Sequence, residues 1–259
     1  MERLTANIVI ESIAAETSKF TAPLVLLHGL WCTPAIWRRF MGYLAHRGWS
    51  GHAPLLRGPG HPNVMGLAEQ RRIVRDVIAA CEAPPVVVGH DSGGWLALQC
   101  ATDQVRARVA LAPVGPAQLL ARAGPLLPSL RLRLAMRLDR PLPAPRGRCG
   151  RAYFGGDAPG GTVPESARLT RELQNDAAAP IPDPRLPTLV VAGTHDRFVP
   201  PSAAHSLAQR IGATFRSLQG AGHALPWALG WEQHAAELHR WLIHSLGEAL
   251  LVPQDEDDS

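Results

Sequence analysis

The sequence predicts an α/β fold in which a mostly parallel central sheet is flanked by helices. Short apolar runs of strand length alternate with segments of helical period, a pattern typical of parallel strands joined by helical crossovers. The chain has 259 residues, the length of one large domain of this class. The predicted strands are Ile8 to Ile13, Leu24 to Leu27, Ser50 to Ala53, Val86 to Val88, Ala107 to Leu111, Thr188 to Val191 and Thr214 to Leu218.

Three segments carry the apolar spacing of helices that cover such a sheet. The first begins at Thr33, an N-cap residue followed by Pro34 at the first helical position. The other two are centred near residues 76 and 237. Their predicted buried residues are Trp37, Phe40, Met41 and Leu44 in the first helix, Ile73, Val74, Val77 and Ile78 in the second, and Trp231, Ala235, Leu238 and Leu242 in the last.

The region from about residue 116 to 184 interrupts this alternation. It is rich in Pro, Gly and Arg, and it separates two predicted strands by far more than an ordinary connection. A long insertion of this kind usually covers a site. We therefore predict a core formed by residues 1–115 and 185–259, with a helical cap inserted at 116–184.

Composition excludes several classes of function. The formal net charge is +4, but Lys19 is the only lysine and the arginines are scattered, which favours a solvated surface over a nucleic-acid site. No apolar stretch reaches the length of a membrane span, and no export signal is recognisable, so a cytoplasmic location without membrane association is expected. The four cysteines lack metal or disulfide spacing and are expected to be free thiols: Cys32, Cys81, Cys100 and Cys149.

No phosphate loop, metal-ligand cluster or dinucleotide fingerprint is present in the sequence. We therefore expect no cofactor and no metal. The expected partners are a small organic substrate and water, and the sequence does not indicate an oligomeric state.

The run GHDSGG at residues 89–94 follows a predicted strand directly and has the character of a nucleophile elbow. In such a turn the apex residue is strained, and the positions two before and two after it must be small. With Asp91 at the apex these positions are Gly89 and Gly93. With Ser92 at the apex one of them is His90, whose ring should clash. The pattern therefore favours Asp91 as the nucleophile.

Three further motifs follow predicted strands, at the sheet edge where open α/β sheets bind ligands. They are HGLW at 28–31, GTHD at 193–196 and GAGH at 220–223. With a nucleophile, an acid and a histidine in this order, the chain resembles the α/β-hydrolase family over essentially its whole length. His90 and His195 are interpreted as scaffold, because a triad needs one histidine and neither follows the appropriate strand.

The arrangement implies a role for each residue. Asp91 is ionised at neutral pH and attacks without a base. His223 then activates water to cleave the resulting ester, and Asp196 holds the imidazole in the useful tautomer. The backbone N–H groups of Leu30 and Ser92 are expected to face the oxyanion.

A carboxylate nucleophile suits displacement at a saturated carbon, because attack on an ester gives a mixed anhydride instead. This logic and the elbow resemble the haloalkane dehalogenase and epoxide hydrolase branches of the family, which implies a small organic epoxide or halide as substrate. Trp31 and Tyr153 are the candidate substrate-binding residues. Trp31 stands where epoxide hydrolases carry proline, and Tyr153 is the only tyrosine of the expected cap. Trp31, Trp95 or Trp227 could supply an indole N–H to a halide.

Two alternatives remain open at this point. The first is a serine-type ester, thioester or lactone hydrolase that uses Ser92 as nucleophile with the same His223 and Asp196. The second is a non-hydrolytic or ligand-binding protein that keeps the pocket for another purpose.

Overall fold

The computed structural model describes residues 8–57, 65–120, 134–135, 137–178, 180 and 182–247. Within these residues a seven-stranded sheet has the order β1-β3-β2-β4-β5-β6-β7. All neighbouring strands are parallel except β1 and β3, which pair antiparallel at one edge. The strands are β1 (Ile10–Ile13), β2 (Leu24–Leu27), β3 (Gly51–Pro54), β4 (Val86–His90), β5 (Ala107–Leu111), β6 (Thr188–Gly193) and β7 (Thr214–Leu218).

Each predicted strand forms within two residues of its predicted bounds, so the predicted fold class is confirmed. β2, β4, β5 and β6 are buried along their whole length, as continuous apolar runs require. The edge strands β1 and β7 are partly exposed. The nucleophile run therefore follows a fully buried strand in the middle of the sheet.

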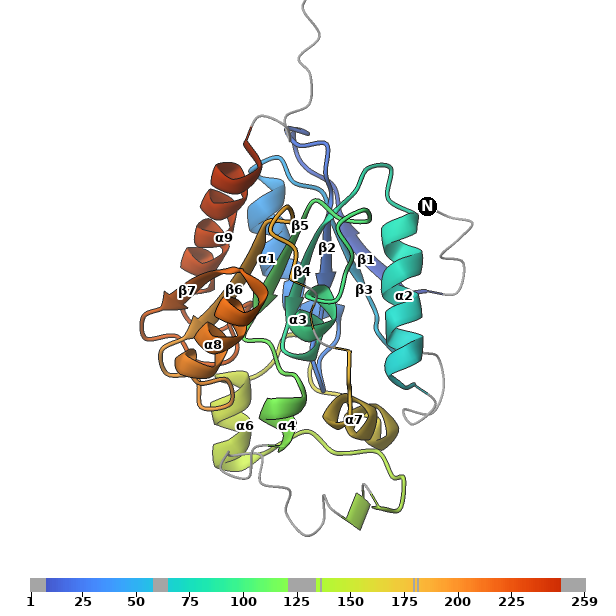
Figure 1. The fold of residues 1–259 in the computed structure, drawn as a ribbon. Helices are drawn as coiled ribbons and strands as arrows, with labels where there is room; N and C mark the ends of the chain where they lie inside the picture. Colours follow the sequence, from blue (N-terminus) through green and yellow to red (C-terminus); the bar gives the residue numbers. More distant parts are fainter. Residues whose placement is uncertain are drawn as a thin grey trace, which may run out of the picture.

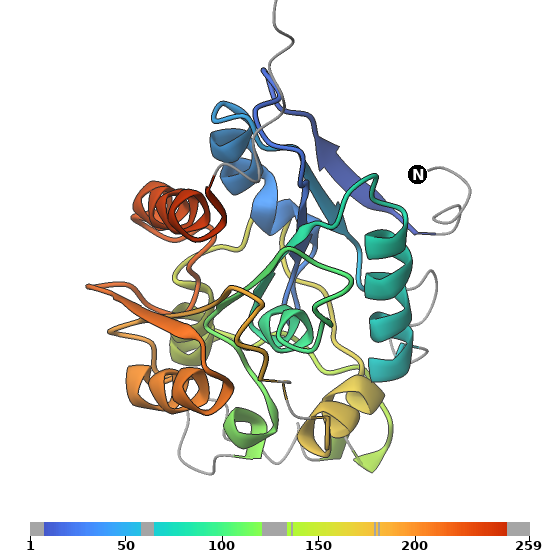
Figure 2. The ribbon, with the colours of Figure 1, turned by 45° about the horizontal axis from the view of Figure 1, so that its top comes forward.

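Helices lie on both faces of the sheet. α1 and α9 pack against each other on one face, whereas α2, α3 and α8 cover the other (Figures 1 and 2). The helical elements are η1 (Pro34–Trp37), α1 (Arg38–Ala45), α2 (Leu67–Ala79), α3 (Ser92–Ala97), α4 (Pro116–Leu120), α6 (Gly147–Phe154), α7 (Ala167–Gln174), α8 (Pro201–Ile211) and α9 (Trp231–Leu246).

The first predicted helix differs from expectation at its start. Thr33 is an extended N-cap followed by Pro34, as predicted, but its side chain makes no capping hydrogen bond. The first turn is the 3₁₀ segment η1, and the α-helix begins at Arg38. Tight turns of this kind are frequent at helix starts, and here all four residues of the turn are buried.

One guanidinium is buried in the core and holds the end of α3. Arg108 on β5 is 1% exposed and donates to the carbonyls of Leu98 and Cys100, just beyond α3, and to the hydroxyl of Thr188. Burial lowers the pKa of Arg108. These bonds supply donors to carbonyls that a helix end otherwise leaves without partners, and so they help to position the helix that begins at the nucleophile run.

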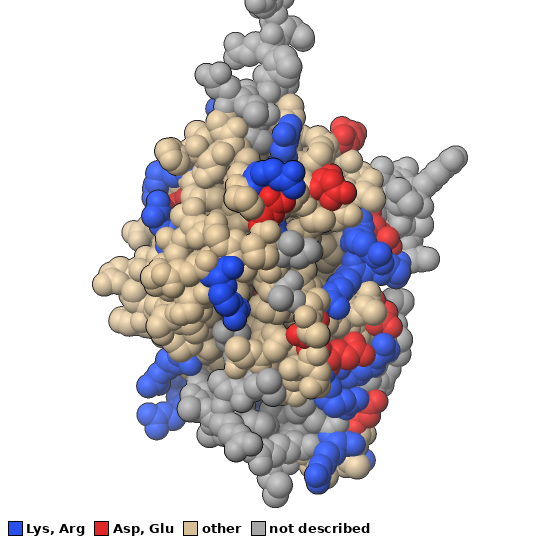
Figure 3. Space-filling model, viewed as in Figure 1, with Lys and Arg blue, Asp and Glu red and all other residues tan. Residues whose placement is uncertain are grey.

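Helices α4, α6 and α7 belong to the inserted segment and lie together at the end of the sheet drawn lowest in Figure 1. Their residues fall within the expected cap, 116–184. We use "cap segment" below for described residues 137–178. On the face drawn in Figure 3 the basic side chains are interspersed with acidic ones and form no single stripe. No helix among the described residues is long and apolar enough to cross a membrane.

Candidate active site

The turn between β4 and α3 holds Asp91 in a backbone conformation that side chains rarely adopt. Its φ is 57° and its ψ is −126°. The Asp91 amide donates to the Leu111 carbonyl at 3.0 Å, and its own carbonyl accepts from the Val114 amide at 3.0 Å. A strained residue persists only where its surroundings fix it. Here the end of the neighbouring strand β5 and the loop after it do so.

The glycines on either side explain why the turn can be this tight. A Cβ at Gly89 would lie 2.0 Å from the Gly93 carbonyl oxygen, and one at Gly93 would lie 2.4 Å from the Leu27 oxygen. Real Cβ atoms cannot approach backbone so closely. The two required glycines therefore flank Asp91, as the sequence spacing predicts, and Ser92 is the first residue of α3.

The carboxylate of Asp91 faces a histidine that a second carboxylate orients. Nε2 of His223 lies 3.2 Å from Oδ2 of Asp91, and Nδ1 lies 2.8 Å from Oδ2 of Asp196. The other Asp196 oxygen accepts the amides of Phe198 and Val199. All three side chains of the triad have no exposed surface. The structure thus brings together Asp91, His223 and Asp196, which lie far apart in the sequence.

The two carboxylates determine the charge of the imidazole. Burial alone would lower the pKa of His223, but attraction and hydrogen bonds from Asp196 and Asp91 outweigh burial and raise it to about 10. Burial would likewise raise the pKa of Asp196, yet His223 and two backbone amides hold it below its ordinary value. The surroundings of His223 therefore favour its protonated form at neutral pH.

Tyr153 reaches the same carboxylate from the cap segment. Its hydroxyl donates to Oδ2 of Asp91, and the residue is 1% exposed. The phenol ring lies 4.7 Å from the ring of His223 and 4.9 Å from that of Phe198, between centroids. The only tyrosine of the expected cap thus donates a hydrogen bond to the candidate nucleophile.

The second oxygen of Asp91 lies on the opposite side of the site. The Ser92 amide donates to Oδ1, and the loop that contains Leu30 passes directly beside it, since a Cβ at Gly29 would lie 2.4 Å from Asp91 Cβ. Among the described residues no acceptor pairs with the Leu30 amide, and no hydrogen bond joins the Ser92 hydroxyl to His223. Of the two amides predicted to face an oxyanion, that of Ser92 donates to Oδ1, and that of Leu30 directly follows Gly29, which lies against Asp91.

The three tryptophans considered as halide ligands all donate their indole N–H to the protein. Trp31 donates to the Leu142 carbonyl at 3.1 Å, Trp95 to Asp176 at 2.8 Å and Trp227 to the Phe154 carbonyl at 3.0 Å. Trp31 still contributes to the site, because its ring packs edge-on against Tyr153 at 5.3 Å between centroids. Its indole N–H, however, is not available to a leaving group in this arrangement.

Two other histidines are buried around the site. His28 donates through Nδ1 to the Gly29 carbonyl and accepts the Leu56 amide at Nε2. Burial, with Arg57 nearby, lowers its pKa to about 3. His90 donates through Nε2 to the backbone carbonyl of His223, and burial lowers its pKa to about 4. Both histidines are neutral and serve as scaffold. The sequence placed His28 in the HGLW motif but did not predict its hydrogen bonds to Gly29 and Leu56.

His195, the other histidine interpreted as scaffold, is exposed. Within the described ranges no group of three or more His, Cys, Asp or Glu side chains could hold a metal ion. The four cysteines are free thiols. Sequence reasoning also missed Arg57 and Glu165, which form a buried ion pair beside the loop at 28–32.

A family model described as "Alpha/beta hydrolase family" matches residues 24–240. The chain therefore belongs to the α/β-hydrolase family, as the order of nucleophile, acid and histidine indicates. No curated protein matches the chain by sequence.

Solved structures similar to the chain share its fold at low sequence identity. A monoacylglycerol lipase from Paleococcus ferrophilus has a TM-score of 0.70 at 21% identity, over 92% of this chain and 98% of that one. A monoglyceride lipase from Saccharomyces cerevisiae has a TM-score of 0.67 at 16% identity, over 91% of each chain. A thermophilic esterase from Thermogutta terrifontis has a TM-score of 0.64 at 17% identity, over 92% of this chain and 93% of that one.

None of these three is named as a dehalogenase or an epoxide hydrolase. At this identity the structural likeness shows the fold alone. The family model shows that the chain belongs to the α/β-hydrolase family. The resemblance to the dehalogenase and epoxide hydrolase branches is not shown.

The charge on His223 predicts a pH dependence of stability. Because its folded pKa lies above the unfolded value of 6.5, its contribution is complete below pH 6.5 and is lost as the pH rises toward 10. Between pH 6.5 and 9 the free energy of unfolding should fall by up to about 1.4 kcal/mol per pH unit, the effect of one proton. Chemical denaturation across this range measures it.

Two variants serve as comparisons. His223→Gln should lack this slope. In Asp91→Asn a neutral amide replaces one of the two carboxylates beside His223, so the loss of stability should begin at a lower pH. An identical slope in wild type and His223→Gln would contradict the assignment of the charged imidazole.

Proposed function

We propose that this protein is a hydrolase that forms a covalent ester on Asp91 and hydrolyses it with water activated by His223. One observation carries the proposal: Asp91, and not Ser92, occupies the strained apex and presents its carboxylate to Nε2 of His223. The order of residues in the triad and its complete burial support a catalytic use of the site.

In the first step Oδ2 of Asp91 attacks a saturated carbon of the substrate. A new C–O bond forms, and the bond from that carbon to the leaving group breaks with its electron pair. If the leaving group is the oxygen of an epoxide, it needs a proton as the ring opens. The Tyr153 hydroxyl lies at Oδ2, and it would deliver this proton to the departing oxygen.

In the second step water attacks the carboxyl carbon of the ester. Esterification removes the negative charge of Asp91, and with it one of the interactions that raise the pKa of His223. The imidazolium can then pass its proton to the Tyr153 phenolate that epoxide opening leaves, and the neutral imidazole accepts a proton from the attacking water. The negative charge develops on Oδ1, which already accepts the Ser92 amide, and the Leu30 amide is the second predicted donor. Collapse breaks the bond between the carboxyl carbon and Oδ2, His223 returns the proton to the departing oxygen, and Asp91 is restored.

The substrate supported best is a small epoxide. A halide leaving group is usually held by donors such as indole N–H groups, and the three tryptophans considered for this purpose donate to Leu142, Asp176 and Phe154. Tyr153, in contrast, places a hydroxyl next to the attacking oxygen. An oxygen leaving group therefore fits the side chains around Asp91 better than a halide does.

The second candidate is an ester hydrolase with Ser92 as nucleophile, and it is favoured by the names of the structural neighbours, which are lipases and an esterase. In this reading Ser92 would have to reach His223, to which its hydroxyl makes no hydrogen bond. The apex would also have to move by one residue, which places His90 where a glycine is required. Fold likeness and local geometry thus favour different nucleophiles, and substitution distinguishes them.

The identity of the nucleophile is tested with Ser92→Ala and Asp91→Ala. The first variant should keep most of the wild-type activity, because only the backbone amide of Ser92 is used. The second should lose about three orders of magnitude or more in kcat, as expected when a covalent nucleophile is removed. Activity is measured on matched panels of small epoxides, alkyl halides and short-chain esters.

The variant His223→Gln allows the intermediate to be observed directly. Because it lacks the base for ester hydrolysis, the ester should accumulate on the peptide that contains Asp91, where mass analysis detects it. Loss of activity in Ser92→Ala, with an adduct on Ser92, would instead establish the ester hydrolase.

The leaving group is tested with Tyr153→Phe. Because an epoxide oxygen needs a proton and a halide does not, the variant should lose about 10² to 10⁴ in kcat/KM for an epoxide. It should lose much less for an alkyl halide with the same carbon skeleton. Steady-state rates for the two matched substrates give the comparison, and an equal loss for both would remove Tyr153 from the role of proton donor.

A further inference from the structure

The cap segment binds the loop beside the candidate nucleophile directly at Trp31. Trp31 has a φ of 57°, which is unusual for a bulky residue, and it is 3% exposed. Its amide donates to Oε2 of Glu165 at 3.0 Å, its indole to the Leu142 carbonyl at 3.1 Å, and its carbonyl accepts the Val163 amide at 3.0 Å. Each polar group of Trp31 therefore has a partner in the cap segment.

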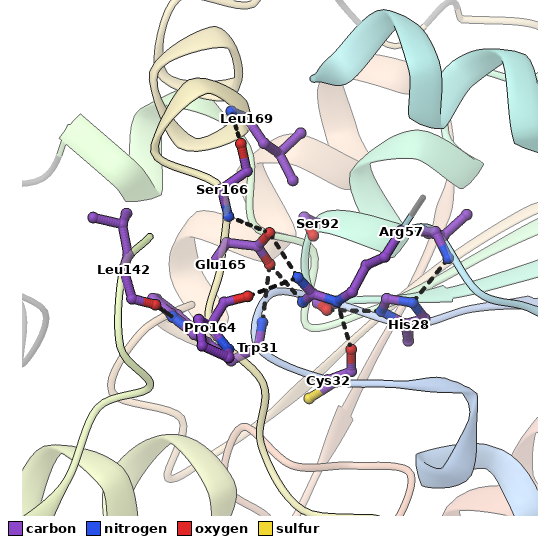
Figure 4. Close-up of polar contacts among 12 residues, drawn as sticks. His28, Trp31, Cys32, Arg57, Ser92, Leu142, Pro164, Glu165, Ser166 and Leu169 are labelled. Carbon is purple, nitrogen blue, oxygen red and sulfur yellow. Dashed lines mark hydrogen bonds and ion pairs between the residues drawn. The ribbon is translucent and has the colours of Figure 1, made fainter. Parts of the chain in front are cut away.

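The carboxylate among these partners belongs to a buried ion pair. Figure 4 shows Glu165 between the Arg57 guanidinium and Trp31. Oε2 of Glu165 lies 2.7 Å from the guanidinium and Oε1 lies 3.0 Å from it, while the Ser166 amide donates to Oε1 at 2.8 Å. The side chain of Glu165 is 3% exposed and that of Arg57 is 15% exposed. A carboxylate with this many donors has a fixed position.

Arg57 joins the same two parts of the molecule. Its Nε donates to the carbonyl of Cys32, in the loop beside the nucleophile, at 3.2 Å. One of its terminal nitrogens donates to the carbonyl of Pro164, in the cap segment, at 3.1 Å. Together Arg57 and Glu165 bind the N–H of Trp31 and the carbonyl of the next residue, and so they hold the loop on both sides of its strained position.

The held peptide group is next to the candidate oxyanion donor. The amide of Trp31 belongs to the peptide bond that follows Leu30, so fixing it restricts the rotation of the Leu30 backbone. The Leu30 amide is one of the two predicted oxyanion donors, and it follows Gly29, which lies against Asp91. The other, from Ser92, is fixed by α3 itself.

We propose that Glu165, held in place by Arg57, is a positioning residue that orients the Leu30 amide for hydrolysis of the ester on Asp91. This inference rests on the proposed function. During ester formation the negative charge leaves the carboxylate, and no oxyanion develops on it. An oxyanion forms on Oδ1 only when water adds to the ester carbon. Loss of Glu165 therefore slows the second step and spares the first.

The chain offers a matched control in Glu172. This residue also fastens the cap segment to the core, because it accepts the Leu67 amide at the start of α2 and pairs with Arg168 at 2.7 Å. It does not touch Trp31 or the loop that contains it. Glu172→Gln therefore weakens the attachment of the cap without changing the partners of the loop.

The test is single-turnover kinetics with styrene oxide as probe, following formation and decay of the ester on Asp91 by rapid quenching and peptide mass analysis. In Glu165→Ala the rate of ester formation should stay within about twofold of wild type, and ester hydrolysis should slow by about 10- to 100-fold, in the range seen when one oxyanion donor is impaired. Glu165→Gln should be slowed less, because its amide oxygen still accepts from Trp31. Glu172→Gln should behave as wild type.

Equal slowing of both steps in Glu165→Ala, hydrolysis at the wild-type rate, or the same defect in Glu172→Gln would overturn the positioning role while leaving the ester on Asp91 intact. If Glu165→Ala does not fold, Glu165→Gln carries the same comparison. An adduct on Ser92, or none on Asp91 in the His223→Gln background, would overturn the proposed function, and this inference with it.

Discussion

The site depends on one backbone constraint, the strained turn that carries Asp91. A non-glycine residue in such a conformation costs on the order of 1–3 kcal/mol, and the turn is possible only because Gly89 and Gly93 allow strand and helix to touch. Hydrogen bonds from the neighbouring strand and loop hold the residue in place. The result is a carboxylate projected from the middle of the sheet toward His223, with one oxygen against the Ser92 amide.

The second organising feature is the balance of charge inside a closed site. Asp91, His223 and Asp196 have no exposed side-chain surface, so each state of the reaction must keep its charges paired. In the free protein Asp196 and Asp91 favour the protonated form of His223. When Asp91 becomes an ester, one partner of the imidazolium disappears, and the proton is more easily lost. In the proposed mechanism, formation of the ester on Asp91 thus allows His223 to act as the base of the next step.

The cap segment contributes side chains to the candidate site. Tyr153 donates a hydrogen bond to Oδ2 of Asp91, and Glu165 accepts the Trp31 amide in the loop at 28–32. The two contributions are linked through Trp31, whose ring packs on Tyr153 and whose backbone is held by Glu165.

Much of this arrangement is predictable from local patterns. The strands follow from apolar runs, and the apex follows from glycine spacing around Asp91. The network around Trp31 is different, because Glu165 and the amide it accepts are 134 residues apart and neither has a distinctive local motif. The acceptors of the three indole N–H groups are also distant in the sequence. The sequence therefore suggested these tryptophans as halide ligands but could not show that each N–H already donates to another part of the protein. The type of reaction cannot be predicted from local patterns either, because lipases and esterases share this fold.

The central claim is that Asp91 forms the covalent bond and that water opens the ester at the carboxyl carbon. The most direct measurement is a single turnover with excess enzyme in water enriched in heavy oxygen, followed by mass analysis of the peptide that contains Asp91. The account predicts one heavy oxygen in the Asp91 carboxylate and none gained by the product. Label found in the product, with an unlabelled Asp91, would contradict it.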